Sequence, residues 1–93
     1  MKDRKDVDAE LHTIRSAARG AADPATRHQI ETARFNLFAA FETHSAGEAA
    51  RWCRALRASL LGAEFDDVRL RHMALDALDV IETALGENHR EAP

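Results

Sequence analysis

Apolar residues recur at every third or fourth position, and this spacing most constrains how the chain can fold. Val7, Leu11, Ile14 and Ala18 stand at i, i+4, i+7 and i+11, which places them on one side of a helix spanning about residues 6–18. The chain also contains nineteen alanines, eleven arginines and no tyrosine, a composition that favours helices over strands. We therefore expect helices that pack their apolar stripes against one another.

Local signals predict where three further helices begin and end. Asp23 is a good N-cap and Pro24 suits a first helical position, which predicts a helix over residues 24–42. Ser45 and Glu48 have the spacing of a capping box, and Gly62 is a natural stop, which predicts a helix over residues 46–61.

The fourth predicted helix covers residues 67–85. Phe65, Asp66 and Leu70 have the spacing of a hydrophobic staple around an N-cap, and Gly86 is the expected end before a polar tail at residues 87–93. Its expected buried stripe is Leu70, Met73, Ala74, Ala77, Leu78, Ile81 and Leu85.

Short connections favour antiparallel neighbours, so residues 1–93 are predicted to form a single all-α domain, a small and mostly antiparallel four-helix bundle. The alternative is a three-helix core with a loosely docked or swapped N-terminal helix.

The stretch from Phe35 to Phe41 points apolar side chains in nearly every direction, with only Asn36 interrupting the ring. A domain of this size buries roughly 60–65% of its unfolded surface, so its interior is thin. We assign Leu37 and Phe41 to the core. Phe35 and Phe38, together with Trp52, are the candidate contacts to a partner, because aromatic anchors dominate interfaces.

The fourth helix carries charge in the order that the helix dipole disfavours, with Arg69 and Arg71 early and Asp76 and Asp79 late. Two copies laid antiparallel would match arginines with carboxylates in both directions, which a two-fold interface requires. These four residues join the candidate partner-binding set. Pairing with the third helix of the same chain explains part of the charge order equally well.

Little else indicates chemistry. His72, Asp76 and Asp79 share one helix face, which does not complete a metal site, and Cys53 lies on an apolar stripe where a buried thiol is expected. We therefore predict no metal, no cofactor and no enzymatic activity. The single cysteine, the charged N-terminus and the excess of arginine over lysine fit a cytoplasmic bacterial protein without a membrane span.

Arg51, Arg54 and Arg57 form a basic flank of the third helix and indicate an alternative function, contact with nucleic acid. The net charge of −3 argues against it. An antiparallel hairpin about residue 64 would also place Arg57 near Asp67 and Arg71, and Arg51 near residues 76–79.

A further alternative comes from the string that runs from His12 to Ala18. It resembles the phosphorylated helix of histidine-phosphotransfer domains, which carry His-x-Leu-Lys-Gly on a four-helix bundle. The resemblance implies that His12 would accept a phosphoryl group. Arg15 and Ser16 stand where that family has lysine and glycine, and the likeness covers only these seven residues.

The favoured function is a non-catalytic protein–protein interaction module, such as a regulator, an adaptor or a small inhibitor, acting as a homodimer.

Overall fold

The computed structural model describes residues 4–91, with side chains described from residue 7 to residue 86. This part of the chain forms the helices α1 (Arg4–Ala18), α2 (Pro24–Glu42), α3 (Ala46–Gly62) and α4 (Val68–Glu91). The all-α prediction is confirmed, because the described residues contain no strand beyond one isolated bridge.

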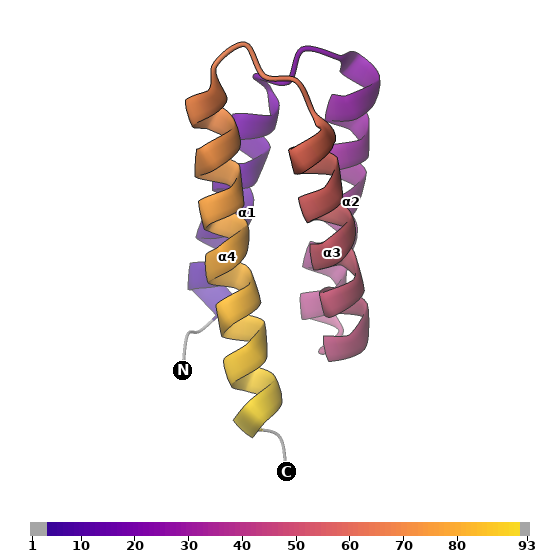
Figure 1. Ribbon diagram of the computed structural model, residues 1–93. Coiled ribbons are helices and arrows are strands. Elements are labelled where there is room, and N and C mark those ends of the chain that lie inside the picture. Colours follow the sequence, from indigo (N-terminus) through magenta and orange to yellow (C-terminus); the bar gives the residue numbers. More distant parts are fainter. Residues whose placement is uncertain (1–3, 92–93) are drawn as a thin grey trace.

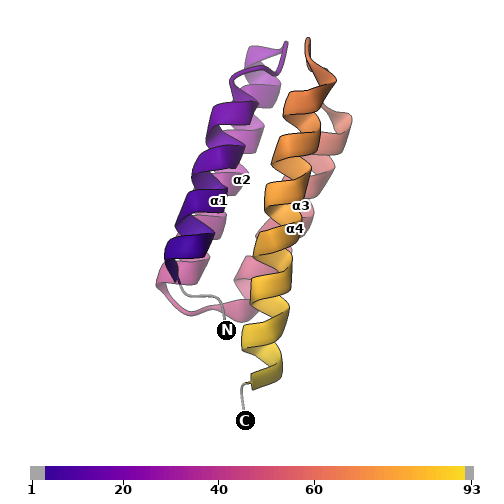
Figure 2. The same cartoon turned by 90° about the vertical axis from the view of Figure 1, so that its left-hand side faces the viewer.

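The helices run up, down, up and down, so that each is antiparallel to its neighbours in sequence (Figure 1). α1 packs most closely against α4, and α2 packs most closely against α3. Figure 2 shows α4 extending past the other helices at the end of the bundle where both termini lie. The structure is thus a small antiparallel four-helix bundle.

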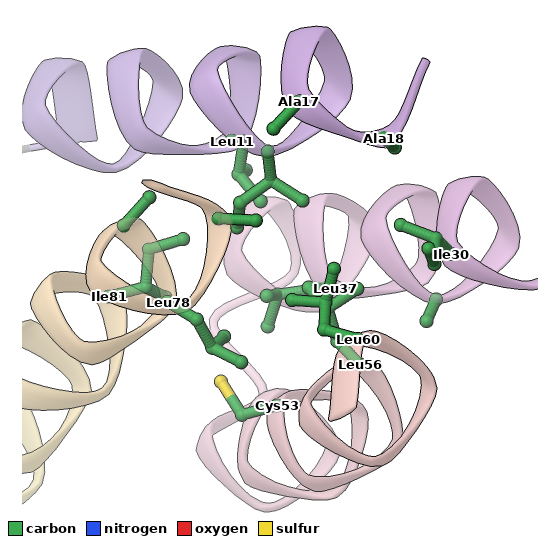
Figure 3. Close-up of a cluster of buried hydrophobic side chains, with 14 of the residues drawn as sticks. Leu11, Ala17, Ala18, Ile30, Leu37, Cys53, Leu56, Leu60, Leu78 and Ile81 are labelled. Carbon is green, nitrogen blue, oxygen red and sulfur yellow. The ribbon is translucent and has the colours of Figure 1, made fainter. Parts of the chain in front are cut away.

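The core lies along the bundle axis and draws on all four helices (Figure 3). Leu11 from α1, Leu37 from α2, Leu56 from α3 and Leu78 from α4 are almost completely buried. Small residues fill the spaces between these large ones, and none of the buried residues in the described range is polar or charged. The side chains of the interior therefore contribute through apolar burial, at roughly 25 cal/mol per Å² removed from water.

The N-terminal helix belongs to this core. Val7, Leu11, Ile14 and Ala18 are all buried, as their spacing predicts, and α1 packs along the length of α4. The alternative of a three-helix core with a loosely docked or swapped first helix is wrong, because the stripe of α1 is covered by its own chain.

Two connections meet at the end of the bundle opposite the termini (Figure 1). Ala21 in the α1–α2 connection forms an isolated antiparallel bridge with Phe65 in the α3–α4 connection. The amide of Ala22 donates a 2.8 Å hydrogen bond to the carbonyl oxygen of Glu64. These bonds join the two helical hairpins at a place where backbone groups would otherwise need water.

The helix starts follow the sequence closely for α2. Asp23 is its N-cap, the Oδ1 atom accepts a 3.3 Å hydrogen bond from the Ala25 amide, and Pro24 occupies the first turn. Ser45 is the N-cap of α3 as expected, but its side chain makes no capping hydrogen bond. The predicted position of the cap is therefore correct, but the Ser45 hydrogen bond of a capping box is not formed.

The predicted start of α4 is wrong by one residue. Asp67, not Asp66, directly precedes the helix and accepts a 3.0 Å hydrogen bond from the Arg69 amide. This shift moves Phe65 out of the staple position. The guanidinium of Arg71 lies over the Phe65 ring instead, 5.7 Å from its centroid.

Two further expectations for α4 are wrong. The helix does not end at Gly86 but continues to Glu91, because a single glycine weakens a helix without requiring it to stop. Met73 is 50% exposed because it lies at the edge of the stripe, whose centre is marked by Ala74, Ala77, Leu78 and Ile81. Residues 92 and 93 of the predicted polar tail lie outside the described residues, as do the side chains of residues 87–91.

Candidate interaction surface

The outer face of α2 carries the most exposed large apolar side chain of the described residues. Phe35 is 61% exposed. It lies two residues before the fully buried Leu37, so the two side chains point about 160° apart around the helix. His28, Thr32 and Glu42 are exposed on the same side of α2, and Ala39 is half-buried there. We call His28, Thr32, Phe35, Ala39 and Glu42 the α2 outer face.

The other aromatic candidates lie closer to the core. Phe38 and Trp52 are half-buried and pack against the core cluster, and so does Phe41, which the sequence assigns to the core. Trp52 also has the guanidinium of Arg51 over its ring, 5.9 Å from the centroid. Leu37 is fully buried as expected. The bundle thus covers only part of the apolar ring, and Phe35 is the member left outside.

One flank of the α2 outer face is held by ion pairs. The Arg34 Nε atom donates to both carboxylate oxygens of Glu31, at 3.0 and 3.1 Å. Arg15 of α1 approaches the same carboxylate at 3.9 Å. The hydrogen bond from Arg34 lowers the pKa of Glu31, so this carboxylate is ionised at neutral pH. The charges beside Phe35 are therefore fixed by the protein's own fold.

Contacts within the chain explain part of the unusual charge order of α4. Arg57 of α3 bonds to Asp79 at 2.5 Å and also to Glu82. These two carboxylates raise the pKa of Arg57. The expected hairpin alignment is wrong, since Arg57 meets residues 79 and 82 and not residues 67 and 71. The connection between the helices bonds to Ala21 and Ala22 and is not a tight turn, which changes the axial offset of α4.

The two candidate arginines of α4 are also engaged locally. Arg69 forms an ion pair with Asp67, with the Nη2 atom 3.0 Å from the Oδ2 atom. Arg71 donates a 2.7 Å hydrogen bond from Nη2 to the carbonyl oxygen of Ala63, and its Nε atom is buried without a partner. Asp76 is exposed and takes part in none of the described ion pairs. The structure therefore brings Arg69, Arg71 and Asp79 to partners of the same chain and not to one shared surface.

A shallow groove of about 350 Å³ lies between the first half of α3 and residues 82–86 of α4. Its lining includes Ala46, Ala50, Cys53 and Leu85. Burial raises the pKa of the Cys53 thiol to about 12, so this cysteine is a neutral, inert side chain at physiological pH. The described lining residues of this groove therefore offer no reactive nucleophile.

The remaining candidate side chains lie apart from one another. His12 is exposed on α1 and His72 is exposed on α4. Arg51 pairs with Glu48 at 3.6 Å, and Arg54 is exposed beside the groove. Among the described residues, no three histidine, cysteine or acidic side chains are placed to hold a metal ion.

Sequence reasoning missed two exposed apolar side chains at the connection end of the bundle. Leu61 is 58% exposed at the end of α3, and Val68 is similarly exposed at the start of α4. The signal was present in the sequence, because both residues fall outside the apolar stripes of their helices.

The chain matches no known family model, and no curated protein or solved structure is significantly similar to it. None of the helices within the described residues has the length and apolar character needed to span a membrane.

Proposed function

We propose that this protein is a non-catalytic protein–protein interaction module, and that it acts as a homodimer through the α2 outer face. The observation that carries the proposal is the exposure of Phe35, an aromatic side chain 61% open to solvent in the middle of a helix. Large aromatic residues that remain exposed at the centre of a surface are typical anchors of interfaces.

The surroundings of Phe35 support this choice over the other candidate surfaces. Three charged residues of α4 already have partners inside the monomer: Asp79 and Glu82 pair with Arg57 of α3, and Arg69 pairs with Asp67. These side chains therefore have little unpaired charge with which to bind a partner. Burying the exposed part of Phe35 would contribute about 1–2 kcal/mol per copy, while the charges beside it are already ordered.

The test is the oligomeric state of two matched variants. Phe35→Lys replaces the exposed aromatic residue with a cation four residues after Glu31, a spacing that supports the helix of the monomer. Leu61→Lys makes the same kind of change at a side chain of similar exposure on another part of the bundle. Size-exclusion chromatography with light scattering should show a dimer for the native chain and Leu61→Lys, and a monomer for Phe35→Lys.

Circular dichroism of all three proteins should show the same helicity, so that loss of the dimer is not loss of the fold. A native chain that stays monomeric up to millimolar concentration would refute self-association. A dimer that survives Phe35→Lys but not Leu61→Lys would place the interface elsewhere.

A further inference from the structure

The four helices are arranged as two closely packed pairs. α1 packs along α4 and α2 packs along α3, whereas the contacts of α3 with α4 and of α1 with α2 are much less extensive. Figure 1 shows α1 and α4 on one side of the bundle and α2 and α3 on the other. The interface between the two pairs is therefore the least extensive layer of the fold.

Within residues 4–91, the backbone joins the two pairs at one end of the bundle only. The α1–α2 and α3–α4 connections both cross between the pairs there, and they bond to each other through the Ala21–Phe65 bridge and the Ala22 amide. At the opposite end, which we call the termini end, the connection at residues 43–45 links α2 to α3 within one pair. The two bonded connections can thus serve as a hinge between the pairs.

The packing between the pairs is loose at the termini end. The shallow groove lies there, between the first half of α3 and residues 82–86 of α4. Its lining on α3 includes the small residues Ala46, Gly47 and Ala50. Small side chains bury little apolar surface and make few dispersion contacts. Separating α3 from α4 should therefore be easier at the termini end than beside the connections.

Partly exposed ion pairs also hold the two pairs of helices together. Arg57 of α3 bonds to Asp79 and Glu82 of α4, and Arg15 of α1 approaches Glu31 of α2 at 3.9 Å. Ion pairs that remain open to solvent contribute little to stability and are screened by salt. These ion pairs can therefore break without a large loss of free energy.

From this arrangement we infer that the bundle opens at the termini end, with α2 and α3 moving as one unit away from α1 and α4 about the two bonded connections. The helices stay intact in this motion, and only side chains between the pairs become accessible. Cys53 is one of them, because it is buried and its sulfur points toward Leu78 of α4 in Figure 3. The inference does not depend on the proposed function, since Phe35 lies on the outside of the moving unit.

Labelling of Cys53 by a disulfide reagent in the native protein tests the opening. The rate is measured at pH 8 and one protein concentration, over urea concentrations well below the unfolding midpoint. Labelling without urea should be at least about tenfold faster than global unfolding allows, and it should rise less steeply with urea because the opening exposes less surface. A rate that follows global unfolding at every urea concentration would refute the opening.

Two controls locate the movement. The Cys53 amide stays inside α3 when the pairs separate, so its hydrogen exchange should report a less populated open state than thiol labelling does. Equal open populations from the two methods would mean that α3 unravels locally, which overturns the inference. Ala21 is buried at the hinge, so Ala21→Cys in a Cys53→Ala chain should be labelled only at the rate of global unfolding. Labelling as fast as that of Cys53 would show that the hinge lies elsewhere.

The ion pairs offer two matched variants. Arg57→Gln removes the bonds from α3 to α4 and should speed native Cys53 labelling about threefold, and molar salt should act similarly on the native chain. Arg69→Gln removes an ion pair with the neighbouring Asp67, which links no two helices, so the labelling rate should stay within about 1.5-fold of the native value. Equal effects of the two variants would contradict the role of Arg57 in closing the bundle.

Discussion

His44 should be a site where one substitution stabilises the protein. It follows α2 with a backbone φ of 55°, in the left-handed region that residues other than glycine rarely adopt. The His44 amide donates a 3.2 Å hydrogen bond to the carbonyl oxygen of Phe41, and the Ser45 amide donates a 2.9 Å hydrogen bond to the carbonyl oxygen of Ala40. These two bonds close the end of α2 in the Schellman arrangement, whose left-handed position is normally occupied by glycine.

The size of the effect follows from two opposing terms. The left-handed conformation costs an L-residue roughly 1–2 kcal/mol, and glycine removes this cost. Glycine also makes the unfolded chain more flexible, which lowers the free energy of unfolding by roughly 0.5–1 kcal/mol. We expect His44→Gly to raise the free energy of unfolding by about 0.5–1 kcal/mol, or the melting temperature by about 3–6 °C in a domain of this size.

Thermal unfolding followed by circular dichroism, at one protein concentration, is the assay. His44→Ala removes the imidazole but keeps the strain, so it should change the melting temperature by less than about 2 °C. His12→Gly places glycine at an exposed position inside α1 and should cost about 1 kcal/mol. If His44→Gly destabilises the protein as much as His12→Gly does, the interpretation of this helix end is wrong.

Three further predictions follow from the packing. Burial raises the pKa of the Cys53 thiol to about 12, so a disulfide reagent at pH 8 should label the native protein at least about a hundredfold more slowly than the denatured one. Rapid labelling of the native protein would contradict the burial of Cys53. Because the thiolate is disfavoured only in the folded state, ionisation of Cys53 should also lower the free energy of unfolding as pH rises from 9.0 to about 12. A Cβ atom at Gly20 would clash with the Leu70 Cδ1 atom, so Gly20→Ala should lower the free energy of unfolding by about 1–2 kcal/mol. The double variant with Leu70→Ala should lose less stability than the sum of the two single variants, because the smaller side chain removes the clash. Strictly additive losses, measured by urea unfolding, would show that the two residues do not meet. Glu82→Gln should lower the free energy of unfolding by about 0.5–1 kcal/mol at low salt and by less at high salt. A double-mutant cycle with Arg57→Gln should give an interaction energy of the same size between Arg57 and Glu82. An interaction energy of zero would mean that the ion pair contributes nothing in solution.

The helices could be predicted well because their signals are local. Asp23, Pro24 and Ser45 mark helix starts by their own chemistry, and the ends of α1 to α3 lie within one or two residues of the expected positions. The error at the start of α4 came where two local signals competed. Asp66 and Asp67 can each cap a helix, and in the structure Asp67 is the one that accepts the bond from the Arg69 amide.

The candidate surface was predictable in part. The off-stripe position of Phe35 indicated its exposure before any coordinates. The ion pairs of Arg57, the bond from Arg71 to Ala63 and the half-burial of Phe38 could not be predicted in the same way. Each depends on how far one helix is shifted or rotated against another.

What the sequence alone determined is therefore the number of helices, their approximate spans and the face that each one buries, because periodicity and capping act within a few residues. Tertiary structure decided which of the surplus apolar and charged side chains find partners inside the monomer. Those choices follow from axial offsets and rotations between helices, and an offset is the combined result of many weak contacts between residues far apart in the chain. The alignment of α4 on α3 matches Asp79 and Glu82 to Arg57, and the rotation of α2 half-buries Phe38 against the core.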